Sequence, residues 1–342
     1  MSAPHAADVA ILGGGSFGSA LALIVAGNGQ RVRLWVRRPE QAEEINQRRS
    51  NGKYLAGARM PDGVVATSEL GAAIAGAPVV LLVVPSRSFR TVAREAGEHI
   101  RGDQILVHAT KGIEIDAFVL MSEILRQETC ARKIGVLSGP NLAAELVAGH
   151  PAGAVVASRY DEVVAAVQAL FRGAHLRVYG GRDVVGVEIG GSFKNVIAIA
   201  AGLTDGLGFG DNARALLLTR GLGEMAQLGV AAGGDVFTFG GLAGVGDLMA
   251  TAGSKLSRNH QLGEKLASGQ SVKAVLESMS YVVEGVPTAA AIQRQAERLG
   301  LALPIVAAVY ALLYQGKTPA EVLRELMALP VGSELAALRF RR

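Results

Sequence analysis

Lys194 lies in an otherwise uncharged segment, where a lysine can act as an acid or a base. It is the only charged residue between positions 189 and 204, and its neighbours are small or apolar. The apolar residues recur at helical spacing, which predicts a helix that faces a protein core. Burial disfavours the ammonium form and brings the pKa of a lysine toward neutrality. We therefore expect a proton donor or acceptor here, although lysines more commonly extend their ammonium groups into water.

Two glycine-rich turns farther along the chain contain more polar candidates. Residues 240–259 include Asp247 and Arg258, and a second turn spans residues 282–288. A carboxylate and a guanidinium in such a turn suit an anionic, hydroxylated ligand. The alternative is that Asp247 and Ser257 cap the helices that follow them. The sequence leaves both interpretations open.

Gly13, Gly15 and Gly18 form a G-x-G-x-x-G pattern directly after a short apolar run. A helical pattern follows and ends at Gly27 or Gly29. These glycines allow a tight turn and let backbone amides approach a pyrophosphate at the positive end of the helix dipole. Because the pattern lies between an expected strand and an expected helix, it predicts a dinucleotide site.

Residues 9–30 carry no charge and are long enough to resemble a signal peptide or a membrane span. Three consecutive glycines and several polar residues interrupt the stretch, and no Lys or Arg precedes it. We therefore expect a strand, a turn and a helix, with no stable membrane insertion.

The expected strand at residues 32–36 ends in Arg37 and Arg38. An acidic residue here would favour NAD, whereas an arginine can accommodate the 2′-phosphate of NADP. The sequence therefore favours NADP, or use of both cofactors. Two solvated arginines close to Glu40 are the structural alternative.

Short apolar runs alternate with helical patterns in the first half of the chain, which predicts an α/β fold with a Rossmann-like doubly wound sheet. Ligands bind beyond the carboxyl ends of such strands. Pro85-Ser86, Lys111 and residues 139–141 all follow expected strands. Lys111 is thus a candidate anion ligand, although a solvated loop lysine is common. The expected strands are residues 8–12, 32–36, 79–84, 105–109, 134–137 and 153–157.

The strand pattern stops near Asp183, and only helical patterns follow. We therefore expect a dinucleotide-binding domain at residues 1–182, an all-helical substrate and catalytic domain at 183–335, and a basic tail at 336–342. The expected helices are residues 184–203, 212–228, 258–267, 272–279, 288–299, 305–314 and 320–327.

The composition excludes several classes of function. With 342 residues, half of them hydrophobic and 19% charged, the chain is globular and long enough for two domains. The net charge of +4 comes from scattered basic residues without interleaved aromatics, which suits a small anionic ligand better than nucleic acid. The single Cys130 cannot form an internal disulfide, and the six histidines lack metal-site spacing, so we expect a reducing compartment and no metal.

Taken together, these motifs resemble the bacterial NAD(P)-dependent glycerol-3-phosphate dehydrogenases. The resemblance covers nearly the whole chain, in order. It rests on GGGSFGSALA, LWVRRPE, VVPS, ATKG, SGPNLA, EIGGSFKNVIAIAAGLTDGLGFGDNARALLLTRGLGEM, GLAGVGDLMAT, SRN and VVEG. It implies reduction of dihydroxyacetone phosphate to sn-glycerol 3-phosphate by a cytoplasmic homodimer that supplies phospholipid synthesis. The alternatives are a dehydrogenase of another hydroxy acid or sugar phosphate, and a non-catalytic NADP-sensing protein.

The resemblance also implies roles at matching positions. Lys194 would be the general acid or base, with Asn195 and Asp247 beside it, and Lys111 would touch both substrate and cofactor. Asn141 stands where the family usually has Ser or Thr. The other expected substrate contacts are Gly139, Asn141, Ser257, Arg258 and Asn259, with the last two on the phosphate. The motifs and the resemblance together give the cofactor contacts as Gly13, Gly15, Ser16, Phe17, Gly18, Arg37, Arg38, Lys111, Ala143, Arg258, Val282 and Glu284.

Overall fold

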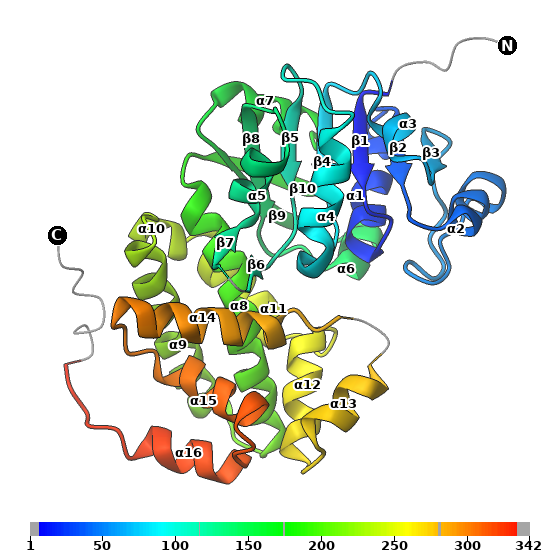
Figure 1. Ribbon diagram of the computed structural model, residues 1–342. Coiled ribbons are helices and arrows are strands. Elements are labelled where there is room, and N and C mark those ends of the chain that lie inside the picture. The colour runs from blue at the N-terminus through cyan, green and yellow to red at the C-terminus, as the bar shows by residue number, and fades with distance from the viewer. Residues whose placement is uncertain (1–6, 116, 174, 280–281, 334–342) are drawn as a thin grey trace, which may run out of the picture. The chain divides into compact units, whose positions relative to one another are not determined.

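The computed structural model describes residues 7–115, 117–173, 175–279 and 282–333 (Figure 1). The chain forms two compact units. The first comprises Met1–Thr110 and Met121–Val184, and the second comprises Lys111–Leu120 and Val185–Arg342. The functions assigned to the two domains stay predictions, and the tail expected at residues 336–342 lies outside the described residues.

The first unit is built around an eight-stranded sheet with the order β10-β9-β8-β5-β4-β1-β2-β3 (Figure 1). All neighbouring strands are parallel except β8 and β9, which are antiparallel. The predicted Rossmann-like sheet is therefore confirmed. Its strands are β1 (Val9–Leu12), β2 (Val32–Trp35), β3 (Val64–Thr67), β4 (Val79–Leu82), β5 (Ile105–His108), β8 (Lys133–Ser138), β9 (Ala152–Ser158) and β10 (Leu176–Gly181).

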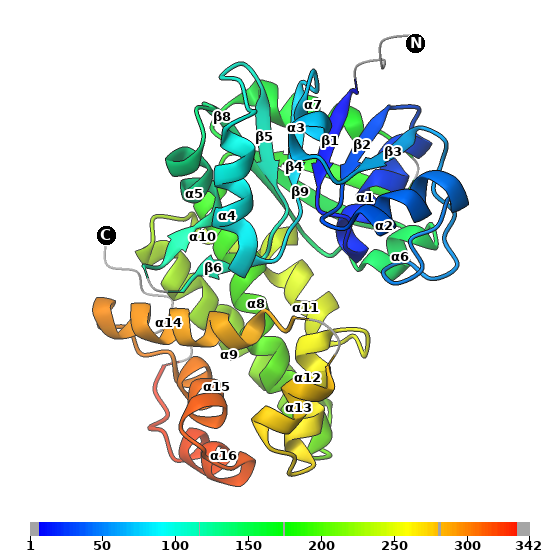
Figure 2. The same ribbon diagram turned by 45° about the vertical axis from the view of Figure 1, so that its right-hand side comes forward.

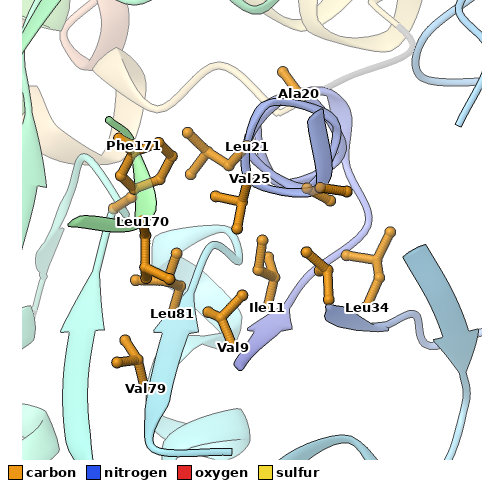
Figure 3. Packing of buried hydrophobic residues seen from close by; sticks show 14 of the residues in the cluster. Val9, Ile11, Ala20, Leu21, Val25, Leu34, Val79, Leu81, Leu170 and Phe171 are labelled. Atoms are coloured by element: carbon orange, nitrogen blue, oxygen red, sulfur yellow. The ribbon is translucent and has the colours of Figure 1, made fainter. Parts of the chain in front are cut away.

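Helices cover both faces of this sheet, which explains why its central strands are apolar without interruption. Val9 and Ile11 of β1 point into one core, where Leu21 and Val25 pack against them (Figure 3). On the opposite face, the ring of His108 lies 5.7 Å from that of Phe89. The helices are α1 (Ser16–Gly27), α2 (Pro39–Glu43), α3 (Leu70–Ile74), α4 (Ser86–Gly97), α5 (Met121–Glu128), α6 (Ala143–Val147) and α7 (Asp161–Leu170), with a π-helical turn η1 (Glu44–Arg48).

The two strands of this sheet that the sequence analysis missed, β3 and β10, lie at its two edges. An edge strand buries fewer side chains than a central strand, so its apolar signal is weak. Val65 in β3 is 55% exposed and Tyr179 in β10 is 53% exposed. β3 offers an apolar run of only three residues, 64–66, and β10 is interrupted by Arg177 and ends in two glycines.

The second unit is mainly helical, as expected, but residues 111–120 add a small antiparallel hairpin of β6 (Ile113–Glu114) and β7 (Val119–Leu120). Figures 1 and 2 show α8 in the middle, with α9 on one side and α12 on the other. The helices are α8 (Val184–Gly206), α9 (Asp211–Ala231), α10 (Val236–Phe239), α11 (Asp247–Ala252), α12 (Arg258–Ala267), α13 (Val272–Ser278), α14 (Gly285–Leu299), α15 (Pro304–Tyr314) and α16 (Pro319–Met327), with a π-helical turn η2 (Leu242–Gly246).

Among the described helices, α8 alone is long and apolar enough to cross a membrane by length and composition. However, 94% of its most apolar window is buried inside the protein. This is the environment of a core helix in a soluble protein.

Two glycines of α8 let other segments approach its backbone. A Cβ atom at Gly190 would lie 2.5 Å from the carbonyl oxygen of Ala243 in η2, the turn that leads into α11. A Cβ atom at Gly202 would lie 1.9 Å from the carbonyl oxygen of His260 in α12. The ring of His260 is also 2.9 Å from the Asp205 carboxylate at the end of α8. Thus α8 fixes the positions of both α11 and α12.

We expect Gly202→Ala to destabilise the protein by about 1–3 kcal/mol, because the new methyl group would collide with the backbone of α12. Gly223→Ala in α9 is the matched control, since a Cβ atom there would have no atom within 4 Å. That substitution should stabilise the protein by about 0.5–1 kcal/mol, because alanine favours helices more than glycine does. Chemical denaturation of the two variants measures both changes, and equal stabilities would contradict the packing argument.

Candidate active site

Lys194 is buried in the middle of α8, with 5% of its surface exposed. Its ammonium donates hydrogen bonds to the Asp247 carboxylate and, at 2.8 Å, to the hydroxyl of Thr251. The alternative interpretation, that the Lys194 ammonium extends into water, is therefore wrong. The side chain is instead held inside the second unit by residues of α11.

Asp247 binds two lysines through its two carboxylate oxygens. Oδ1 accepts from Lys194, and Oδ2 accepts from Lys111 Nζ at 2.7 Å. The Asp247 side chain is 2% exposed, and that of Lys111 is 18% exposed. With both lysines protonated, the cluster carries one net positive charge in a largely dry environment. Such a site favours a substrate oxygen on which negative charge develops.

Burial lowers the pKa of Lys194 from 10.5 to about 7. The Asp247 carboxylate opposes this shift, and the nearby Lys111 ammonium reinforces it. Desolvation is the largest cause, because a buried ammonium loses the water that would stabilise its charge. A lysine with this pKa can donate or accept a proton near neutral pH.

The expected alternative for residues 240–259 is that Asp247 and Ser257 cap the helices that follow them, and the two residues differ in this respect. Ser257 is the N-cap of α12, and its hydroxyl accepts from the His260 amide. Asp247 is not an N-cap, because Gly246 occupies that position of α11. The capping interpretation is thus confirmed for Ser257 and wrong for Asp247, whose carboxylate binds the lysines instead.

Asn195, which follows Lys194 in the chain, and Asn259 form a second buried pair. Asn259 Nδ2 donates to Asn195 Oδ1 at 2.9 Å, and Asn259 Oδ1 accepts from the Gly285 amide at 3.0 Å. These bonds connect α8, α12 and the first residue of α14. They also fix the backbone beside Arg258 and Glu284, two of the expected ligand contacts.

Thr251 belongs to the lysine cluster, but the sequence analysis gave it no catalytic role. Its hydroxyl accepts from Lys194 and lies 3.3 Å from Asp247 Oδ1. A signal was present, because residues four apart share one face of a helix, and Thr251 follows Asp247 by four positions. Recognising it required knowing that a helix begins at Asp247.

The glycine-rich turn of the first unit fits a dinucleotide pyrophosphate. Gly13 has φ +125°, and a Cβ atom there would lie 2.3 Å from the Val83 carbonyl oxygen. A Cβ atom at Gly18 would lie 1.9 Å from the Gly13 carbonyl oxygen, whereas one at Gly15 would have no atom within 4 Å. Gly13 and Gly18 are therefore needed for the turn itself. The space beside Gly15, the N-cap of α1, is open to a ligand.

The other predicted residues have defined positions within their own units. Ser16 and Phe17 begin α1, and Ala143 begins α6, which packs against α1. Arg37 and Arg38 are exposed just after β2. Two more expected contacts lie in the first unit: Gly139, which follows β8 and has φ +130°, and Asn141, which is 8% exposed. The second unit contains Arg258, Val282 and Glu284.

We expect Gly15→Ala to preserve the fold but weaken NADPH binding, because a methyl group would occupy space that the pyrophosphate needs. Gly18→Ala should instead destabilise the protein, since its methyl group would collide with the Gly13 carbonyl. Thermal unfolding combined with NADPH titration separates the two effects. A Gly15→Ala protein with unchanged NADPH affinity would contradict this assignment of the pyrophosphate site.

Comparison with known proteins covers both halves of the chain. The N-terminal model of NAD-dependent glycerol-3-phosphate dehydrogenase matches residues 8–164, and the C-terminal model of the same family matches residues 183–324. The glycerol-3-phosphate dehydrogenase [NAD(P)+] of Teredinibacter turnerae is 44% identical over 96% of each chain. That of Geobacillus thermodenitrificans is 46% identical over 94% of each chain.

A solved structure of a glycerol-3-phosphate dehydrogenase is also similar to this chain over nearly its whole length. The crystal structure of glycerol-3-phosphate dehydrogenase from Coxiella burnetii has a TM-score of 0.91 and 34% identity, and the match covers 95% of this chain and 100% of that one. Since the similarity extends through both units at these identities, the chain belongs to the NAD-dependent glycerol-3-phosphate dehydrogenase family.

Proposed function

We propose that this protein uses NAD(P)H to reduce dihydroxyacetone phosphate to sn-glycerol 3-phosphate, with Lys194 as the proton donor. The observation that carries the assignment of Lys194 is its burial against Asp247, with its pKa lowered to about 7. The names of the relatives support the substrate pair. A protein that only sensed NADP would have no need for a buried lysine poised to exchange a proton.

The bound cofactor would supply the hydride that the ketone carbon receives. Lys194 donates its proton to the carbonyl oxygen as negative charge develops there, which is typically worth about 10² to 10⁴ in rate. Asp247 keeps the ammonium oriented, and Lys111 adds positive charge beside the same carboxylate. In the reverse reaction, neutral Lys194 removes the proton from the hydroxyl group.

The remaining contacts position the substrate and the cofactor. Arg258 and Asn259 would bind the substrate phosphate, so that binding energy orients the distant ketone. Gly139, Asn141 and Ser257 would complete the substrate site. The cofactor would lie on the glycine-rich turn, and exposed Arg37 and Arg38 favour NADP through its 2′-phosphate. We further propose a cytoplasmic homodimer that supplies a phospholipid precursor.

The function is tested by following NADPH and, separately, NADH oxidation with dihydroxyacetone phosphate as substrate. We expect turnover with both and a preference for NADPH. In the same assay, Lys194→Met should lower kcat by about 10² to 10⁴ and leave NADPH affinity unchanged. Lys273→Met is the matched control, because that side chain is 85% exposed in α13 of the same unit. Wild-type activity in Lys194→Met would disprove the proton-transfer role.

We expect opposite pH dependences in the two directions, with the change centred near pH 7. Ketone reduction needs protonated Lys194, so its kcat/KM should fall as pH rises through the lowered pKa. Alcohol oxidation needs neutral Lys194, so its kcat/KM should rise over the same interval. Parallel initial-rate profiles from about pH 5 to about pH 9, a window of roughly two units on either side of that pKa, measure both. Profiles without a break in this window, as expected for a lysine that keeps its ordinary pKa of about 10, would contradict the effect of burial.

A further inference from the structure

Two buried amide side chains hold the carbonyl group of Gly14, the middle residue of the three glycines at 13–15. Gln41 Nε2 donates to Gly14 O at 2.7 Å, and Asn51 Nδ2 donates to the same oxygen at 3.0 Å. Gln41 is 6% exposed and Asn51 is fully buried. Asn51 also donates to Ser19 Oγ in α1 at 2.7 Å, and Gln41 donates to Asn51 Oδ1 at 3.2 Å. The turn, α1 and α2 are therefore joined by one network of hydrogen bonds.

This network sets the direction of the next backbone amide. In a trans peptide the carbonyl and the following N–H point to opposite sides. Because the Gly14 carbonyl points toward Gln41 and Asn51, the Gly15 N–H points away from them. The space beside Gly15 is open, since a Cβ atom there would have no neighbour within 4 Å.

Gly14 must itself be a glycine for the two amides to reach its carbonyl. A Cβ atom at Gly14 would lie 2.3 Å from Val36 Cγ1 and 3.2 Å from Gln41 Nε2. Any side chain at this position would displace the side chain of Gln41 or that of Val36, which follows β2. Gly14 is a variable position in the G-x-G-x-x-G pattern, so the pattern alone gives no reason for this glycine.

We propose that Gln41 and Asn51 are positioning residues for cofactor binding: they turn the Gly15 amide toward the pyrophosphate and keep the Gly14 carbonyl away from it. A carbonyl oxygen facing a phosphate would be repelled, whereas an N–H group attracts it. Gln41 lies in α2, whose N-cap is Arg38. The network therefore also connects the expected 2′-phosphate contact to the pyrophosphate turn. This inference rests on the proposed cofactor site.

The test compares Gln41→Leu and Asn51→Leu with the wild-type protein in NADPH fluorescence titrations and steady-state kinetics. We expect the Kd and KM for NADPH to rise about tenfold in each variant, as when one hydrogen bond that orients a binding group is lost. The KM for dihydroxyacetone phosphate and kcat at saturating NADPH should remain unchanged. A purely structural role would lower the melting temperature and the active fraction without changing the KM for NADPH.

Adenosine 2′-monophosphate is the discriminating probe, because it has the adenosine and the 2′-phosphate but no pyrophosphate. Its inhibition constant should be the same in wild type and variants. Gln47→Leu is the matched control, since Gln47 is an exposed amide in η1 whose side chain donates to the Glu43 carboxylate. This variant should bind NADPH normally.

Unchanged NADPH affinity in Gln41→Leu would overturn the inference, as would an equal loss of affinity for the pyrophosphate-free probe. If Asn51→Leu fails to fold, Gln41→Leu decides the question, because Asn51 still bonds to Gly14 in that variant. A wild-type protein that does not bind NADPH would overturn the cofactor assignment itself. Normal NADPH binding by wild type and both variants would overturn only the role of the two amides.

Discussion

The candidate active site depends on one carboxylate shared by two lysines. Removing a charged group from water is costly unless an opposite charge and hydrogen bonds compensate. Asp247 provides both to Lys194 and Lys111, and Thr251 adds a further acceptor for Lys194. The compensation is incomplete, because two ammonium groups share one carboxylate. Burial lowers the pKa of Lys194, and the second ammonium reinforces that shift. The excess positive charge also favours an anionic oxygen beside the cluster.

Close packing of helix backbones makes this arrangement possible. Gly190 lets the turn before α11 touch α8 on one side of Lys194, and Gly202 lets α12 touch α8 on the other. The first contact brings in Asp247, and the second brings in Asn259. Because larger residues at either glycine would separate the backbones, the positions of these polar groups follow from the packing of small residues.

The first unit uses a related arrangement, in which buried hydrogen bonds set the direction of a backbone amide that we propose faces the cofactor. The glycine-rich turn has few side chains of its own, so neighbouring segments must hold it. Gln41 and Asn51 do so from positions well beyond the motif. In both units, buried hydrogen bonds between distant segments fix the geometry of the groups that we propose as ligand contacts.

The α/β class, the central strands, most of the helices and the lysine in an uncharged segment can all be predicted from the amino-acid sequence. These features are local, because strands and helices have characteristic apolar periods. In the edge strands β3 and β10 this signal is short or interrupted. The folded chain was needed to show that Lys194 is buried, that Asp247 binds two lysines instead of capping a helix, and that Thr251 joins them. Desolvation and ion pairing depend on segments far apart in the chain, and no local pattern records which segments will meet.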